Sequence, residues 1–176
     1  MKEFNNILEI YNFCADIINS NYNSIDELSI NDKVLYFRNH IDKNILNRFF
    51  IVGNLSIDLF NNFSVNTRTI KLSVDSLIKN ILEHPEISIK EYSNLPNYIN
   101  NAEYILKKSN KNLIYFKIEN NIYQFVIKKT KNGNELFITT FHKASINQLN
   151  KDLKRYQIIN KKDSSDSEDS KYPSVT

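Results

Sequence analysis

The sequence has little glycine and little cysteine, and each shortage excludes a class of site. Only two glycines occur in 176 residues, which excludes a glycine-rich phosphate loop, because such a loop needs glycines at fixed spacing around a lysine. The single cysteine, Cys14, excludes an internal disulfide and is typical of a reducing compartment. No apolar run approaches the roughly 18 residues that a membrane span needs, and no signal peptide is recognisable after Met1–Asn6. We therefore expect a soluble, cytoplasmic protein that contacts no membrane.

Metal ligands and serine nucleophiles are also scarce. The three histidines, His40, His84 and His142, lie far apart from one another and from Cys14, without C-x-x-C or H-E-x-x-H spacing. The G-x-S-x-G motif of serine hydrolases is absent. We therefore expect no metal and no cofactor. What remains is chemistry that needs only side-chain acids, bases and cations.

The composition fits one domain with an uneven charge. Hydrophobic residues make up 41% and aromatic residues 12% of the chain, enough to bury a core. The net charge is only +3, but residues 71–160 hold fourteen lysines and arginines against eight acidic residues. Such a basic surface is expected where a protein meets a polyanion. A lysine-rich solvated surface is the simpler alternative.

Periodicity in the first part of the chain predicts a helical extension over residues 1–47. Apolar residues at three- and four-residue spacing predict an amphipathic helix over about 3–19. Residues 33–37 form either a short strand or the start of a second helix. Residues 48–52 read as a strand that ends at a turn at Gly53, and Ser56 caps a short helix.

The second part of the chain predicts an α+β fold, a helix followed by a four-stranded antiparallel sheet. After a short strand at 69–72, Ser73 is a candidate N-cap for a helix that Pro85 ends. Two short helical turns lie within 88–101, and a last helix covers about 146–157. Asn132-Gly133 is a strong hairpin signal. The four strands are predicted at Ala102–Lys107, Leu113–Ile118, Ile122–Lys128 and Leu136–Phe141.

The predicted domain covers residues 48–158, and residues 159–176 are predicted to be a disordered acidic tail. The tail is rich in serine and acidic residues and has no apolar periodicity. It reads as a solubilising segment, with phosphorylation of its serines as the less favoured alternative.

Metal-free cleavage of RNA needs a base for the 2′-hydroxyl, an acid for the leaving oxygen and a cation for the developing charge. His142 is a candidate acid or base, because strand alternation places it on one face with Ile138 and Thr140. His84 closes the helix before Pro85, where a favourable position at the helix C-terminus is the simpler explanation.

Cations and aromatic residues near the predicted strands are candidates for RNA binding. Lys79, Lys128 and Lys143 are candidate phosphate contacts, and Tyr115 is a candidate for stacking on a base. Lysines at a strand edge also serve to prevent aggregation, and a strand tyrosine also serves in packing.

Short motifs over residues 49–145 occur in an order that resembles a known family. They are Leu72-Ser73 with Asp75-Ser76-Leu77, His84-Pro85-Glu86, Glu91-Tyr92 with Leu95-Pro96, the strand Phe125–Lys128, and Thr139-Thr140-Phe141. They resemble the phage-associated barnase–EndoU–colicin–RelE-like nuclease domains. The resemblance implies a helix followed by a four-stranded antiparallel sheet, RNA cleavage, and a phage or mobile-element origin. It places His84, Thr139 and Thr140 on recurring family positions as candidate catalytic residues.

One position departs from the family pattern. Family members often carry a histidine within the helix, in a Lys-His step, and here the step reads Lys79-Asn80. We predict a metal-independent endoribonuclease, acting as a toxin or effector, with RNA and an antitoxin or immunity protein as partners. The alternative is an inactive RNA- or protein-binding module of phage origin, which Asn80 favours. An ADP-ribosyl-transferring toxin ranks last, because no nicotinamide-binding signature is recognisable.

Overall fold

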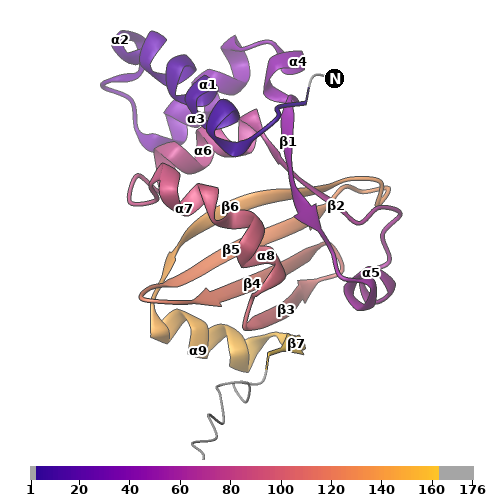
Figure 1. Cartoon of the computed structure of the whole chain (residues 1–176). Helices are drawn as coiled ribbons and strands as arrows, with labels where there is room; N and C mark the ends of the chain where they lie inside the picture. The colour runs from indigo at the N-terminus through magenta and orange to yellow at the C-terminus, as the bar shows by residue number, and fades with distance from the viewer. Residues whose placement is uncertain (1–2, 163–176) are drawn as a thin grey trace, which may run out of the picture.

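The computed structural model describes residues 3–162 and is built around one mixed β-sheet (Figure 1). The sheet has seven strands in the order β1-β2-β6-β5-β4-β3-β7. Neighbouring strands are antiparallel except β2 and β6, which pair in parallel where Ile70 and Lys71 meet Leu136 and Phe137. The strands are β1 (Phe49–Asn54), β2 (Thr69–Ser73), β3 (Tyr104–Ser109), β4 (Asn112–Ile118), β5 (Ile122–Lys129), β6 (Leu136–Ala144) and β7 (Gln157–Lys161).

The predicted four-stranded antiparallel sheet is therefore wrong in strand number and in pairing. The four predicted strands are β3 to β6 and form an antiparallel meander, but they make up only the middle of the sheet. β1 and β2 extend it at one edge through the parallel pair, and β7 extends it at the other. Alternation predicts a strand but not its distant neighbours, because those depend on contacts between residues far apart in the sequence.

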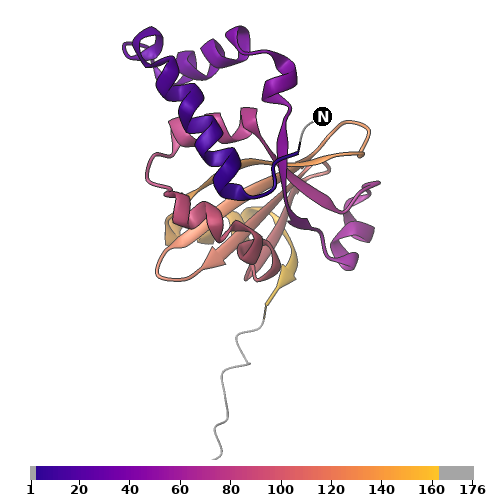
Figure 2. The same ribbon diagram turned by 45° about the horizontal axis from the view of Figure 1, so that its top comes forward.

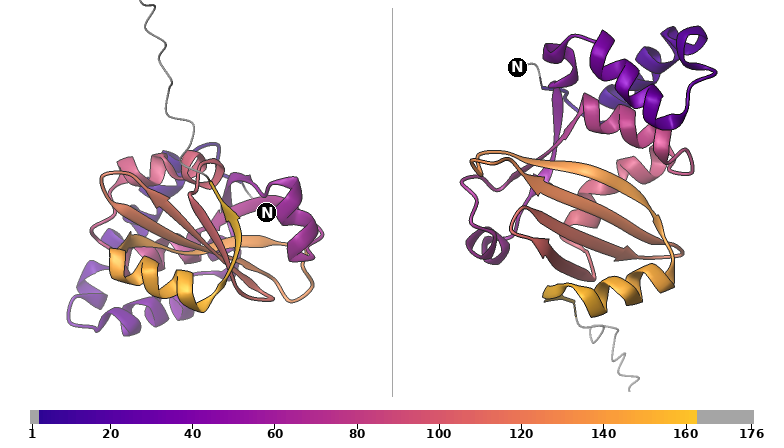
Figure 3. Two further views of the ribbon diagram at one scale, coloured as in Figure 1. Left: turned by 90° about the horizontal axis from the view of Figure 1, so that it is seen from below. Right: turned by 180° about the vertical axis from the view of Figure 1, so that it is seen from behind.

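Nine helices are described within residues 3–162, and all but two cover one side of the sheet or its upper edge (Figures 1 and 2). α5 lies within the connection between β1 and β2, and α9 lies against the opposite face (Figure 3). The helices are α1 (Ile7–Ser20), α2 (Tyr22–Ile25), α3 (Ile30–His40), α4 (Lys43–Leu46), α5 (Ile57–Phe63), α6 (Val74–Glu83), α7 (Ile89–Ser93), α8 (Leu95–Asn100) and α9 (Ile146–Arg155).

α6 is the central helix and places much of the candidate site. It begins where predicted, because the Ser73 side chain accepts a hydrogen bond from the Ser76 backbone N–H. It ends at Glu83 with His84 as its C-cap, since the following Pro85 disfavours helical geometry in the residue before it. α6 packs against α1, α3 and β6, so its outer residues lie at the junction of the helical layer and the sheet.

The sheet separates a large core from a small one. In the large core, the apolar side of α1, including Ile10 and Cys14, packs with strand residues such as Phe125 and Phe141. Burial raises the pKa of the Cys14 thiol, which therefore stays neutral. The small core lies between the other face and α9, around Leu149. The residues 1–47 predicted as an extension thus share the main core from Phe4 onward.

The last predicted helix ends earlier than expected. α9 ends at Arg155, and residues 157–161 continue as β7, which pairs with β3. The start of the predicted acidic tail, residues 159–162, is thus partly strand, and residues 163–176 lie outside the described part of the chain. None of the helices within residues 3–162 is long and apolar enough to cross a membrane.

Candidate functional site

A β-bulge in β6 shapes the candidate site. Val126 of β5 faces Thr140, but the next residue, Ile127, faces Ile138, so Thr139 is an extra residue in β6. The simple alternation predicted from the sequence therefore fails here. Ile138 lies in the large core with Phe141, whereas Thr140 and His142 face the other side. Bulges often re-aim side chains next to functional sites, and this one brings both threonines to one pocket.

Asn80 of α6 holds the bulge in place. Its side chain is completely buried. Its Oδ1 accepts a hydrogen bond from the Phe141 backbone N–H at 2.8 Å, and its Nδ2 donates to the carbonyl oxygens of Ser76, at 2.6 Å, and Thr139, at 3.4 Å. The amide therefore substitutes for a neighbouring strand at the edge of β6. The Asn80 side chain thus positions the backbone of β6 and is not among the residues that line the pocket.

The pocket beside the bulge has a volume of about 420 Å³ and is mostly basic. Arg38, Lys79, Lys108 and Lys128 contribute four cations, and Asp75 contributes one carboxylate. Arg38 holds Asp75 through two hydrogen bonds of 2.8 and 3.0 Å. Lys79 lies 3.5 Å from Glu83 in the same helix. The remaining lining residues are Ser76, Asn112, Val126, Thr139 and Thr140.

A second hollow extends this basic pocket toward α3 and α4. It has a volume of about 460 Å³ and shares Arg38, Asp75, Ser76 and Thr139 with the first. Lys43 adds a further cation there. We call the two hollows together the basic groove, which lies at the junction of α6 and β6.

His84 and His142 come together next to the basic groove. Their rings stack with centroids 4.9 Å apart and planes inclined by 23°. His142 lies two residues beyond Thr140 on the same face of β6, so it is about 7 Å further along the strand. Nδ1 of His84 lies 3.5 Å from Oε1 of Glu86, a contact that is an ion pair only while His84 carries a proton. Two imidazoles from distant parts of the chain thus meet beside the basic groove.

The surroundings of His142 favour its neutral form. Burial, with the adjacent His84 next in importance, lowers the pKa of His142 below its usual value. Its Nδ1 is buried and has no hydrogen-bond partner within residues 3–162. Gln124, opposite His142 in β5, donates a hydrogen bond of 2.9 Å to the buried carboxylate of Asp152 in α9. A neutral imidazole at this place is a suitable proton acceptor.

Two of the predicted RNA-binding residues lie on the other face of the sheet. Lys143 forms an ion pair of 2.9 Å with Glu91 of α7. Tyr115 is 1% exposed and stacks on Phe125 in the large core. Neither side chain lines the basic groove. Both follow from strand alternation, which sends them to the face covered by α7 and α8 (Figure 1).

The structure adds residues that the sequence did not single out. Arg38 and Lys43 come from the N-terminal helices, and no local motif connects them with β6. Lys108 and Asn112 flank the turn between β3 and β4, and Lys128 faces Asn112 across the strand pair. The sequence signal for Lys108 was the lysine content of the β3–β4 hairpin. These lysines were part of the charge asymmetry, but the asymmetry did not indicate which face of the sheet they lie on.

The described residues, 3–162, contain no group of three or more histidine, cysteine and acidic side chains placed to hold a metal ion. Comparison of the chain with protein-family models, with curated proteins and with solved structures finds no match.

Proposed function

We propose that this protein is a metal-independent endoribonuclease that binds the RNA backbone along the basic groove and cleaves it at the His84–His142 pair. The observation that carries the proposal is the stacked pair of imidazoles beside Thr140 on the face that also presents Lys79 and Lys128. The family resemblance of residues 49–145 supports the same activity. We place this action in the cytosol, because RNA is present there and because a single cysteine is typical of a reducing compartment.

The two histidines differ in a way that suits a divided role. His142 is disposed to be neutral, and because its Nδ1 is buried, Nε2 is the nitrogen that exchanges a proton. His84 has a different neighbour, since its Nδ1 lies 3.5 Å from the carboxylate of Glu86. In the proposed step, His142 takes the proton of the 2′-hydroxyl, whose oxygen forms a bond to phosphorus. The bond from phosphorus to the 5′-oxygen breaks, and His84 gives that oxygen its proton. The products are a 2′,3′-cyclic phosphate and a 5′-hydroxyl.

The groove supplies the charge that this reaction needs. Lys79 of α6 and Lys128 of β5 line the same pocket as the threonine pair and are the proposed contacts for the phosphate oxygens. The hydroxyl of Thr140 is the proposed neutral donor, because the strand places it between these cations and His142. Arg38, whose guanidinium is held by Asp75, is the proposed contact for a neighbouring phosphate of the RNA backbone.

The test is cleavage of a short single-stranded RNA by the purified full chain in excess EDTA. We expect fragments that end in a 2′,3′-cyclic phosphate, and no cleavage where the nucleotide at the scissile position is 2′-deoxy. His142→Ala and His84→Ala are each expected to reduce the rate by at least a hundredfold. His40→Ala is the matched control, since His40 stacks on Tyr36 and does not line the groove, so its loss should leave the rate unchanged.

Binding is measured separately from cleavage. Lys128→Gln is expected to weaken RNA binding and to lower the slope of log affinity against log salt by roughly one. Lys161→Gln removes the same charge from β7 at the far edge of the sheet and should change the affinity far less. Salt-dependent binding that Lys128 controls, without any cleavage, would exclude the endoribonuclease and favour an RNA-binding module. Cleavage that survives both histidine substitutions would remove the imidazole pair from the reaction.

The family resemblance also leads us to propose a toxin or effector role, with an antitoxin or immunity protein as partner. Expression in a bacterial host is then expected to arrest growth and fragment cellular RNA. The double variant His84→Ala, His142→Ala is expected to do neither at the same expression level. Growth arrest with intact RNA would contradict this role.

A further inference from the structure

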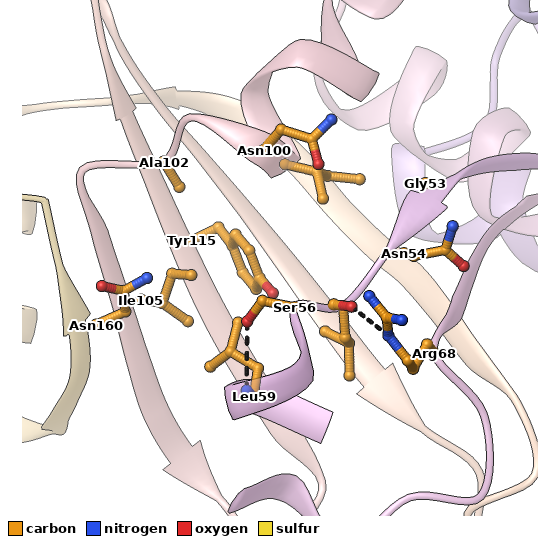
Figure 4. Close-up of a pocket in the computed structure, with 12 residues that line it drawn as sticks. Gly53, Asn54, Ser56, Leu59, Arg68, Asn100, Ala102, Ile105, Tyr115 and Asn160 are labelled. Atoms are coloured by element: carbon orange, nitrogen blue, oxygen red, sulfur yellow. Dashed lines mark hydrogen bonds between the residues drawn. The ribbon is translucent and has the colours of Figure 1, made fainter. Parts of the chain in front are cut away.

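A separate pocket lies on the face of the sheet opposite the basic groove, between the end of β1, α5 and the strands β3 and β4 (Figure 4). Its volume is about 400 Å³. Its base is apolar and includes Leu59, Ile99 and Ile105. Its rim is polar and carries the side-chain amides of Asn54, Asn100 and Asn160, with the guanidinium of Arg68 (Figure 4).

The buried hydroxyl of Tyr115 has no protein partner in this pocket. The tyrosine is 1% exposed, and its oxygen makes no hydrogen bond within the described residues 3–162. Figure 4 shows the ring in the middle of the lining residues with its hydroxyl directed toward Ser56. Burying a hydroxyl without a partner costs about 1–3 kcal/mol. Burial also raises the pKa of Tyr115, so the hydroxyl keeps its proton and is a donor at neutral pH.

Arg68 is oriented so that its charge remains available. Its Nε donates a hydrogen bond of 2.8 Å to the Leu55 carbonyl, which fixes the plane of the guanidinium. Its two Nη nitrogens make no hydrogen bond or ion pair with a protein group of residues 3–162. No aspartate or glutamate lines the pocket. The lining therefore carries one positive charge, a buried hydroxyl donor and several amide donors, without a carboxylate to oppose an anion.

We propose that this pocket binds a small anion that bears a carboxylate or phosphate group. Arg68 binds the anion through its Nη nitrogens, because a guanidinium presents two parallel donors to such a group. The Tyr115 hydroxyl donates to one of the anion's oxygens and thereby gains the partner that it lacks. The apolar base accommodates an attached aliphatic or planar part. Tyr115 of β4 and its partner Ile105 of β3 lie on the face of the large core, whereas the basic groove lies on the other face. This site is therefore independent of the proposed cleavage site.

The experiment is an NMR titration of the full chain with inorganic phosphate and, separately, with acetate. Binding in the pocket is expected to shift the backbone amide signals of residues 53–56 and 68. We expect Arg68→Gln to weaken the binding that these signals report by at least tenfold, and Tyr115→Phe to weaken it by about tenfold, as expected for loss of a hydrogen bond to a charged group. Tyr115→Phe removes only an unpartnered hydroxyl and is expected to fold at least as well as the native chain.

A matched control separates this site from the basic groove. Lys128→Gln alters the groove and should leave the titration of residues 53–56 unchanged, just as Arg68→Gln should leave RNA cleavage unchanged. Shifts with phosphate only or with acetate only would each support the proposal and identify the anionic group. If neither anion shifts these signals, or if both variants bind as tightly as the native chain, the proposal is wrong.

Discussion

Replacing Asn80 by alanine tests whether this side chain holds the bulge in β6. The substitution removes an acceptor for the Phe141 backbone N–H and a donor to two carbonyl oxygens. The site is completely buried, so water cannot replace these bonds without opening the junction of α6 and β6. The bond from Phe141 is therefore the main loss, because its N–H is left buried without a partner.

The magnitude follows from these contacts. Leaving the Phe141 N–H unsatisfied costs about 1–3 kcal/mol, and loss of the longer bond to Thr139 adds about 0.5–1 kcal/mol. The Ser76 carbonyl remains within α6 and adds little. We therefore expect the free energy of unfolding to fall by about 3 kcal/mol, a large part of the 5–15 kcal/mol typical of a domain. With an m-value of roughly 2 kcal/mol/M, the urea midpoint should fall by about 1.5 M.

The measurement is urea unfolding followed by circular dichroism, since the chain has no tryptophan. Asn39→Ala is the control, because Asn39 is exposed on α3 and its loss should cost less than about 0.5 kcal/mol. In Asn80→Asp, a buried carboxylate would face the Ser76 and Thr139 carbonyls, so stability should rise as the pH falls and the carboxyl takes up a proton. A loss in Asn80→Ala no larger than that in the control would refute the reasoning.

Three further outcomes follow from single groups. Burial raises the pKa of Glu91, but the Lys143 ion pair and hydrogen bonds from Ser88 and Tyr123 outweigh burial and hold this pKa at about 2 against an ordinary 4.5. The stability that these contacts confer is therefore present above pH 4.5 and is lost as the pH falls toward 2. Acid titration of Glu91→Gln should lack that loss. Because burial lowers the pKa of His142, the acid limb of the cleavage rate should lie below pH 6.5, and a limb above pH 6.5 would contradict its role as the base. Gly133 has a φ of +72°, and Gly133→Ala should lower the free energy of unfolding by about 1 kcal/mol in urea, with no effect on cleavage.

Local patterns in the sequence determined the elements near the site. Ser73 and Pro85 define the ends of α6 because capping and proline geometry act within a few residues. Alternation and the Asn132-Gly133 turn define the strands β3 to β6 for the same reason. The charge asymmetry indicated a basic surface but not which face carries it.

Only the tertiary structure decided which side chains meet. The parallel pairing of β2 with β6 adds β1 and β2 to one edge of the sheet, and no local signal encodes a contact between residues so far apart. The bulge at Thr139 reverses the alternation of β6, so Ile138 enters the core and Thr139 joins Thr140 at the groove. His84 meets His142 because α6 packs on β6 through Asn80. Such contacts depend on the summed packing of distant segments, whereas the sequence by itself determined only what each segment does within a few residues of chain.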